Sequence, residues 1–105
     1  MIEVTSAEQL EELLETNPRV IAMFTAVWCG PCHNIKPEFE HLSVEYGTVT
    51  FLSIDVDRNP ELAARYRISA MPTFVSFQHG YETDHRLGAH PETLRRMVRE
   101  LAATF

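Results

Sequence analysis

Cysteine and lysine are nearly absent from this 105-residue sequence, which contains two cysteines and a single lysine, Lys36. Two cysteines cannot build a disulfide framework, and two thiols alone cannot complete a structural zinc site. No apolar run approaches the roughly 20 residues that a membrane helix requires, so we expect no membrane partner. The start of the sequence has no basic segment followed by an apolar stretch, which predicts that no secretory signal is present and that the protein is cytoplasmic.

Positive charge is also in short supply. Nine Lys and Arg residues face fifteen Asp and Glu residues, which gives a net charge of −6 and argues against nucleic acid as a partner. The hydrophobic content of 45% and the charged content of 23% are typical of globular proteins, so disorder is excluded. The length predicts a single domain over residues 1–105, because a second core would not fit.

The apolar pattern predicts an α/β fold with a central mixed sheet, helices on both faces and the order βαβαβαββα. Strands are expected at 2–4, 19–25, 49–55, 73–77 and 81–87, and helices at 6–16, 31–46 and 60–66 and from Pro91 onward. The five consecutive apolar residues at 20–24 favour a strand buried on both faces.

Local signals predict where several elements begin and end. Thr5 and Glu8 have the spacing of a capping box, and Asn59 precedes a proline as a helix N-cap would. Pro37 should kink the second helix, and Gly47 should end it. His79-Gly80 is expected to be the turn of a hairpin.

The most informative motif is Trp28-Cys29-Gly30-Pro31-Cys32, between a buried strand and a helix. Three residue steps along a helix place the two sulfurs about one turn apart, close enough to bond. Cys29 falls at the helix start, where free N–H groups and the helix dipole favour a thiolate. Cys32 falls one turn inside, where it is shielded and suited to resolving a mixed disulfide. We expect an exposed catalytic dithiol, with Trp28 as a contact surface for substrate.

The competing interpretation of a Cys-x-x-Cys pair is half of a zinc site. His33 and His41 lie on the same predicted helix, but neither makes a recognised Cys/His spacing. The sequence therefore favours a redox pair and no metal site. His33 is expected to be solvated and to point away from Cys32, with tuning of the site as the alternative.

At this point the sequence resembles the thioredoxin family, over roughly residues 2–101. The pentapeptide at 28–32 matches the active-site signature of the family, Pro37 matches the helix kink, and Met71-Pro72-Thr73 matches the cis-proline segment. Gly80 and Gly88 match the hairpin turn and the groove glycine. The resemblance implies that Cys29 attacks, that Cys32 resolves and that Pro72 is cis. It also implies a docking surface for an extended substrate, formed by Trp28, Gly30, Pro31, Ala70, Met71, Pro72, Gly88 and Ala89.

The sequence departs from this family at two positions. Met23 stands where thioredoxins usually carry a buried aspartate, and Ser53 stands where they commonly carry its lysine partner. An apolar Met23 removes the penalty of burying a carboxylate, but it also removes the expected proton acceptor for Cys32. The route by which Cys32 loses its proton is therefore open.

The sequence as a whole predicts a monomeric protein-disulfide reductase. Its redox-active group is the Cys29–Cys32 pair, and no bound cofactor is expected. By resemblance, electrons come from NADPH through a thioredoxin reductase, and the substrates are proteins with disulfides. Two alternatives stay open: an oxidase or isomerase of the disulfide isomerase type, and an interaction module that docks partners through the surface around Trp28 and Pro72.

Overall fold

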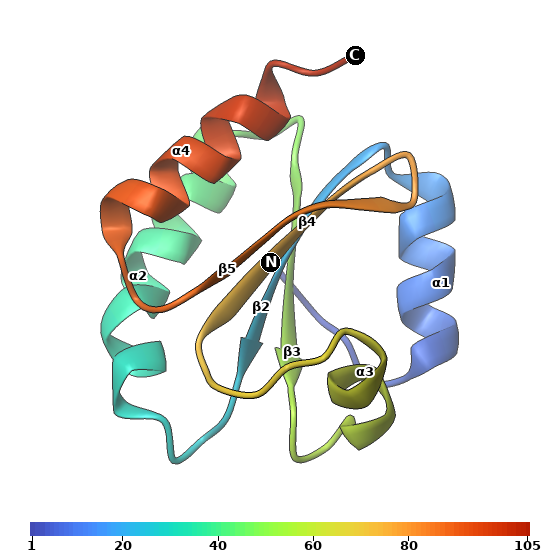
Figure 1. The fold of residues 1–105 in the computed structure, drawn as a ribbon. Helices are drawn as coiled ribbons and strands as arrows, with labels where there is room; N and C mark the ends of the chain where they lie inside the picture. The colour runs from blue at the N-terminus through green and yellow to red at the C-terminus, as the bar shows by residue number, and fades with distance from the viewer.

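The five strands form one mixed sheet in the computed structural model, which describes residues 1–105. The strands are β1 (Ile2–Glu3), β2 (Arg19–Thr25), β3 (Thr50–Asp55), β4 (Thr73–Gln78) and β5 (Tyr81–Leu87). Their order across the sheet is β1-β3-β2-β4-β5. The β1–β3 and β2–β3 pairs are parallel, whereas β2–β4 and β4–β5 are antiparallel. The parallel strands β2 and β3 therefore end at the same edge of the sheet, at the bottom of Figure 1.

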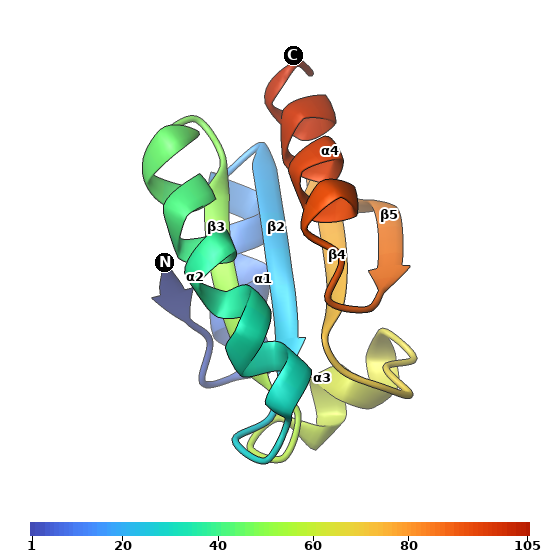
Figure 2. The same ribbon diagram turned by 90° about the vertical axis from the view of Figure 1, so that its left-hand side faces the viewer.

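Four helices cover the sheet in two layers. They are α1 (Ala7–Thr16), α2 (Gly30–Glu45), α3 (Pro60–Arg65) and α4 (Pro91–Ala102). Figure 1 shows α2 and α4 on one face and α1 and α3 on the other, and Figure 2 views the face that carries α2 and α4. The predicted fold class and element order are confirmed. None of the helices combines the length and the apolar character needed to cross a membrane.

Each face of the sheet has its own hydrophobic core, and β2 contributes to both. Ile21 and Met23 pack with α2 and α4, while Val20, Ala22 and Phe24 pack on the opposite side, where α1 and α3 lie. This alternation explains the uninterrupted apolar run, because a central strand covered by helices on both faces has no solvated side. The prediction of a doubly buried strand is confirmed.

One predicted helix cap is wrong, and another is at the predicted residue but lacks a side-chain capping bond. The N-cap of α1 is Ser6, whose hydroxyl accepts a hydrogen bond from the backbone N–H of Gln9, while the Gln9 side chain accepts from the N–H of Thr5. The capping pair is thus shifted by one residue from Thr5 and Glu8, since both pairs have the same spacing and local sequence does not choose between them. Asn59 is the N-cap of α3 as predicted, but its side chain makes no capping hydrogen bond, and its amide donates to the carbonyl oxygens of Val4 and Asp55.

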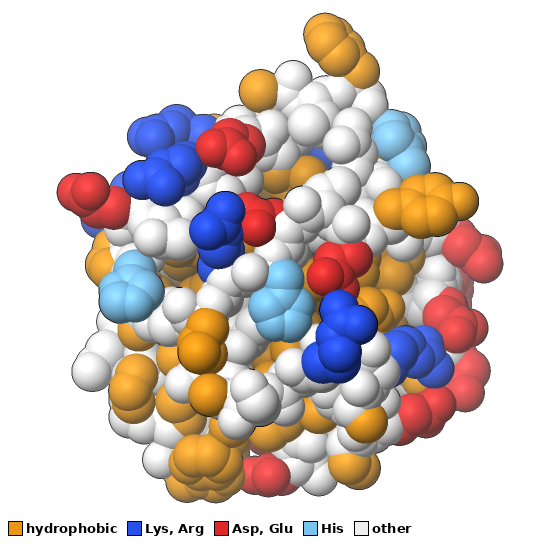
Figure 3. All heavy atoms as spheres, in the orientation of Figure 1, with side chains coloured by type: hydrophobic (Ala, Val, Ile, Leu, Met, Phe, Trp, Pro, Cys, Tyr) orange, Lys and Arg blue, Asp and Glu red, His pale blue; other side chains and the backbone are white.

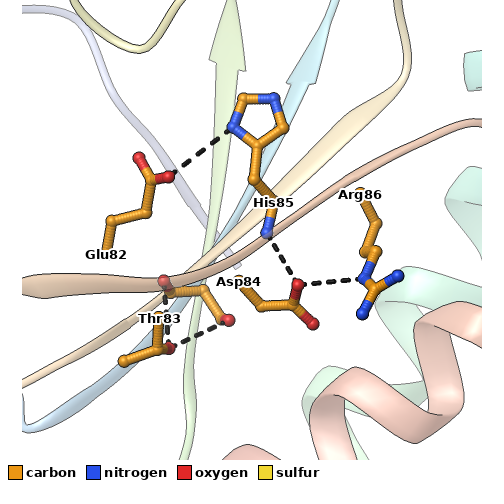
Figure 4. A network of polar contacts seen from close by, with 6 residues as sticks. Glu82, Thr83, Asp84, His85 and Arg86 are labelled. Atoms are coloured by element: carbon orange, nitrogen blue, oxygen red, sulfur yellow. Dashed lines mark hydrogen bonds and ion pairs between the residues drawn. The ribbon is translucent and has the colours of Figure 1, made fainter.

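The hairpin between β4 and β5 closes through the predicted turn. His79 and Gly80 have φ values of 52° and 86°, so both central residues are in the left-handed region that a tight hairpin turn requires. A bulge next to Ser76 and Phe77 breaks the register of the two strands. The edge strand β5 carries exposed polar side chains, and Figure 4 shows Arg86 bonded to Asp84 and the imidazole of His85 facing Glu82. Charged side chains on an edge strand oppose pairing with another chain.

Candidate active site

The two cysteines lie at the carboxyl end of β2, in the loop that leads into α2. They are joined by a disulfide, with a Cα–Cα distance of 5.3 Å. Cys29 is the N-cap of α2, and its Sγ accepts a hydrogen bond of 3.2 Å from the backbone N–H of Cys32. The prediction that the two sulfurs are close enough to bond is confirmed. A thiolate on Cys29 would meet the same N–H group and the positive end of the helix dipole, both of which favour the anion.

The two cysteines are buried, which differs from the expectation of an exposed pair. Cys29 is only 4% exposed and Cys32 only 2%. In this oxidised form both cysteines pack with Ala26, and Val56 and Met71 lie against the cluster. The expectation of an exposed pair is therefore wrong for the disulfide, because two neighbouring loops cover it. Cys32 is shielded, as predicted.

Trp28 and Val27 form the exposed apolar rim of this loop. The Trp28 side chain is 66% exposed, and hydrophobic side chains gather at this lower end of the molecule in Figure 3. The Trp28 indole N–H donates a hydrogen bond of 2.8 Å to Asp57 Oδ2, on the loop after β3. Asp57 had not been singled out from the sequence, because its contribution depends on β3 lying next to β2.

The segment before β4 faces the cysteines, and the structure has the Met71–Pro72 peptide bond in cis, as the resemblance implied. Met71 is half-buried against the cysteine cluster, and Pro72 is buried. The backbone N–H of Gly88 donates to the carbonyl oxygen of Pro72 at 2.8 Å. Gly88 has a φ of 108°, and the His90 imidazole occupies the space that a Cβ on Gly88 would need. The two loops of the expected docking surface are thus tied together.

The remaining residues expected on the docking surface are placed differently from one another. Gly30 and Pro31 are exposed at the start of α2, and Ala70 is half-buried, with its carbonyl oxygen accepting from the Thr73 hydroxyl at 2.7 Å. Ala89 is half-buried because it packs against the core between α2 and α4. The structure therefore exposes Gly30 and Pro31 more than Ala70 and Ala89.

His33 is exposed, as expected, but its ring folds back onto the loop. Its Nε2 lies 2.8 Å from the carbonyl oxygen of Val27. A carbonyl oxygen only accepts, so Nε2 carries the hydrogen in this contact. This bond joins the first turn of α2 to the exposed rim before Cys29. The His33 ring is therefore fixed to the loop and is not only solvated.

A small cavity of about 140 Å³ lies beneath Cys32, on the face of the sheet that α2 covers. Met23 and Ser53 pair across β2 and β3, and both line this cavity with Cys32. The two positions at which the sequence departs from the thioredoxin pattern therefore both adjoin Cys32. Met23 is 1% exposed, so an apolar side chain suits the position.

Comparison with known proteins agrees with this geometry. The family model described as Thioredoxin matches residues 1–100. Thioredoxin from Mycoplasma genitalium is 38% identical over 91 residues, which are 87% of this chain and 89% of that protein. The X-ray structure of Fasciola hepatica thioredoxin superposes with a TM-score of 0.92 at 40% identity, covering 96% of this chain and 99% of that one.

Some relatives are much longer than this chain. The peptide-N(4)-(N-acetyl-beta-glucosaminyl)asparagine amidase of Caenorhabditis briggsae is 41% identical over 101 residues, and the match covers 93% of this chain but only 17% of that protein. The family model, by contrast, spans both cysteines and all five strands of this chain. The chain belongs to the thioredoxin family, and with its Cys29–Cys32 pair it is a thiol–disulfide oxidoreductase that reduces protein disulfides.

Proposed function

We propose that Cys29 is the attacking thiolate and Cys32 the resolving thiol in the reduction of disulfides in other proteins. The observation that carries this assignment is the hydrogen bond from the Cys32 N–H to Cys29 Sγ at the start of α2. That donor and the helix dipole favour negative charge on Cys29, whereas Cys32 lies inside the first turn, beneath the loop.

The docking surface for substrate is proposed to consist of the exposed rim and the loops that face it. Its members are Trp28, Gly30, Pro31, Ala70, Met71, Pro72, Gly88 and Ala89. The free backbone groups next to Pro72 offer main-chain pairing to an extended substrate, which suits a reductase that acts on many sequences. This surface supports reduction of folded partners with an accessible disulfide segment.

The cycle is completed by an external reductant. We infer that electrons pass from NADPH through a thioredoxin reductase to the Cys29–Cys32 disulfide, with no cofactor bound to this chain. The protein is proposed to act as a monomer in the cytoplasm, where thiols are kept reduced. The match to thioredoxins does not favour the alternatives of a disulfide isomerase or a docking module.

The assignment of the cysteines is tested with two single variants and an insulin-reduction assay driven by dithiothreitol. Cys29→Ser should abolish reduction, whereas Cys32→Ser should still attack and accumulate a mixed disulfide through Cys29. Mass spectrometry locates the adduct. An adduct through Cys32 in Cys29→Ser, with none through Cys29 in Cys32→Ser, would reverse the assignment. Repeating the assay with NADPH and candidate reductases then tests the source of electrons.

A further inference from the structure

The cavity beneath Cys32 brings the resolving thiol together with a fixed carboxylate at the end of β3. Asp55 and Lys36 line the cavity with Cys32. Asp55 pairs with Thr25 in the parallel register, two residues further along each strand than the Met23–Ser53 pair. Since alternate residues of a strand face the same side, Ser53 and Asp55 both face α2. The carboxylate and the thiol thus share one small space.

The Asp55 side chain is held in place by backbone groups. Its Oδ1 accepts hydrogen bonds from the N–H of Asp57 at 2.9 Å and from the N–H of Arg58 at 3.2 Å. Its Oδ2 makes no hydrogen bond within the protein, and the residue is half-buried. A carboxylate has several acceptor sites, so one oxygen can orient the group while the other accepts a proton.

Cys32 has a chemical need that this arrangement meets. A thiol attacks a disulfide only as the thiolate, and the ordinary thiol pKa of about 8.5 leaves little thiolate at neutral pH. Cys32 is only 2% exposed, so its thiol has little direct contact with bulk water. The cavity is partly polar and large enough to hold water, and water with two or more polar partners is stable in such a space.

We propose that Asp55 accepts the proton of Cys32, relayed by water in this cavity, when Cys32 resolves the mixed disulfide. This proposal rests on the proposed roles of the two cysteines. The Cys32 proton passes to the Asp55 carboxylate, and the Cys32 thiolate attacks Cys29 Sγ. The Cys29–Cys32 bond forms, the bond from Cys29 to the substrate breaks, and the substrate leaves as a thiolate. The cysteine pair is oxidised by two electrons, and the substrate disulfide is reduced by two.

Three other charged or titratable side chains line the same cavity: Glu3, His33 and Lys36. Glu3 is exposed on the two-residue edge strand β1. His33 uses Nε2 to bind the Val27 carbonyl, which leaves only Nδ1 as an acceptor. Lys36, one turn after Cys32, is exposed, and its ammonium group donates hydrogen bonds but accepts none. Asp55 is the acceptor that the backbone orients, and His33 is the competitor that the experiment must separate from it.

The test compares Asp55→Asn with Asp55→Glu and His33→Gln. Asparagine keeps an oxygen that accepts from the N–H groups of Asp57 and Arg58, so the turn is preserved while the proton acceptor is lost. Glutamate keeps the carboxylate. Trp28 is the only tryptophan and lies next to Cys29, so its fluorescence follows attack and resolution in stopped flow. Acid quenching and mass spectrometry identify the adduct.

We expect the rate of attack in Asp55→Asn to stay within about twofold of the native rate. The rate of resolution near pH 7 should fall by about tenfold or more, because loss of a general base costs at least that much. The defect should shrink as pH rises, because hydroxide replaces the missing acceptor. Asp55→Glu should restore most of the rate, and His33→Gln should leave it unchanged. Asp55→Ser, whose hydroxyl also accepts from the turn, gives the same readout if Asp55→Asn fails to fold.

The proposal is overturned if resolution in Asp55→Asn stays within twofold of the native protein, or if His33→Gln slows it as much. The cysteine on which the mixed disulfide accumulates distinguishes failure of this proposal from failure of the proposed function. Slow resolution with the substrate on Cys29 supports both assignments. A substrate trapped on Cys32 overturns the roles of the cysteines, and with them the role of Asp55.

Discussion

The indole of Trp28 is hydrogen-bonded to Asp57, which ties the active-site loop after β2 to the loop after β3. Both residues are exposed, so the bond orients the ring and adds little to stability. On the proposed docking surface, the orientation of this ring would set how a substrate backbone approaches Cys29. We therefore expect the bond to affect docking more than folding.

Asp57→Ala is expected to weaken docking. Loss of the acceptor frees the indole, so KM for a protein disulfide should rise about fivefold, equivalent to about 1 kcal/mol, while the free energy of unfolding changes by less than that amount. Asp57→Asn keeps an acceptor oxygen and is the matched control. Steady-state reduction of insulin and urea unfolding measure the two effects. Equal KM values for native protein and Asp57→Ala would show that the bond does not orient the ring for substrate.

Gly88→Ala should destabilise the docking surface. Alanine is strained at a φ of 108°, and its Cβ would lie 2.6 Å from His90 Nε2. We expect a loss of about 1–3 kcal/mol in thermal unfolding and slower substrate reduction, because Gly88 also donates to the Pro72 carbonyl. His90→Ala removes the close contact but not the backbone strain, so the double variant should recover only part of the loss. Full recovery would assign the whole effect to the imidazole.

Met23→Asp would bury a carboxyl group in the cavity beneath Cys32. The expected cost near pH 7 is about 2–4 kcal/mol, since no partner at Ser53 neutralises the charge. Burial raises the pKa of such a group in the folded state, so the native state binds its proton more tightly than the unfolded chain. The deficit should therefore grow as pH rises from about 4 toward 7.

The same variant checks the proton route. In an Asp55→Asn background, Met23→Asp supplies a second carboxylate to the cavity, so it should speed resolution of the mixed disulfide. Met23→Leu is the matched control, because it keeps the volume and adds no acceptor. Urea unfolding across pH measures the cost, and stopped flow measures the rate. A stability deficit that shrinks between pH 4 and pH 7 would contradict burial of the new group.

The burial of Tyr66 should make the free energy of unfolding depend on pH in the alkaline range. Burial raises the pKa of Tyr66 above its ordinary value of 10.0, and the neighbouring Arg65 partly opposes this shift. The ring packs on Phe24 and Phe77, with centroid distances of 6.0 and 5.5 Å. The native state holds the proton more tightly than the unfolded chain, so this contribution to stability is complete below pH 10 and is lost as pH rises through the native pKa.

Tyr66→Phe should therefore flatten the decline of stability between pH 9 and pH 11. Urea unfolding at a series of pH values measures the slope. Tyr81→Phe is the control, because the Tyr81 ring is exposed and the slope should match the native protein. An unchanged slope in Tyr66→Phe would assign the alkaline decline to other groups.

The sequence predicted the order of elements because the signals for them are local. The apolar run at 20–24 and the periodic Leu94, Met97, Val98 and Leu101 each report burial of a single segment, and the structure buries all four helix residues. The cysteine pair was found in the same way, since both members lie in one five-residue motif. Asn59 is the N-cap that the local pattern predicted, but the bond of its side chain to Val4, 55 residues away in the sequence, is not a local signal.

The rest of the site depends on strands that are distant in sequence. Asp55 shares a cavity with Cys32, and Asp57 bonds to Trp28, because β3 lies beside β2, an order that no local pattern reports. The burial of Cys29 depends likewise on Val56 and Met71, which come from two other loops. Residues that act through such contacts become visible only when the sheet order is known.

The central position of β2 has a consequence for motion. It is hydrogen-bonded along its length to β3 on one side and to β4 on the other, so its amides should open only with the whole domain. Hydrogen exchange should be slowest at residues 20–24 and should change little between the oxidised and reduced forms. Beyond Thr25 the chain leaves both ladders, so the structural response to redox state should be confined to the few residues that carry the sulfurs. The reactive pair thus follows directly after the strand that we expect to open last.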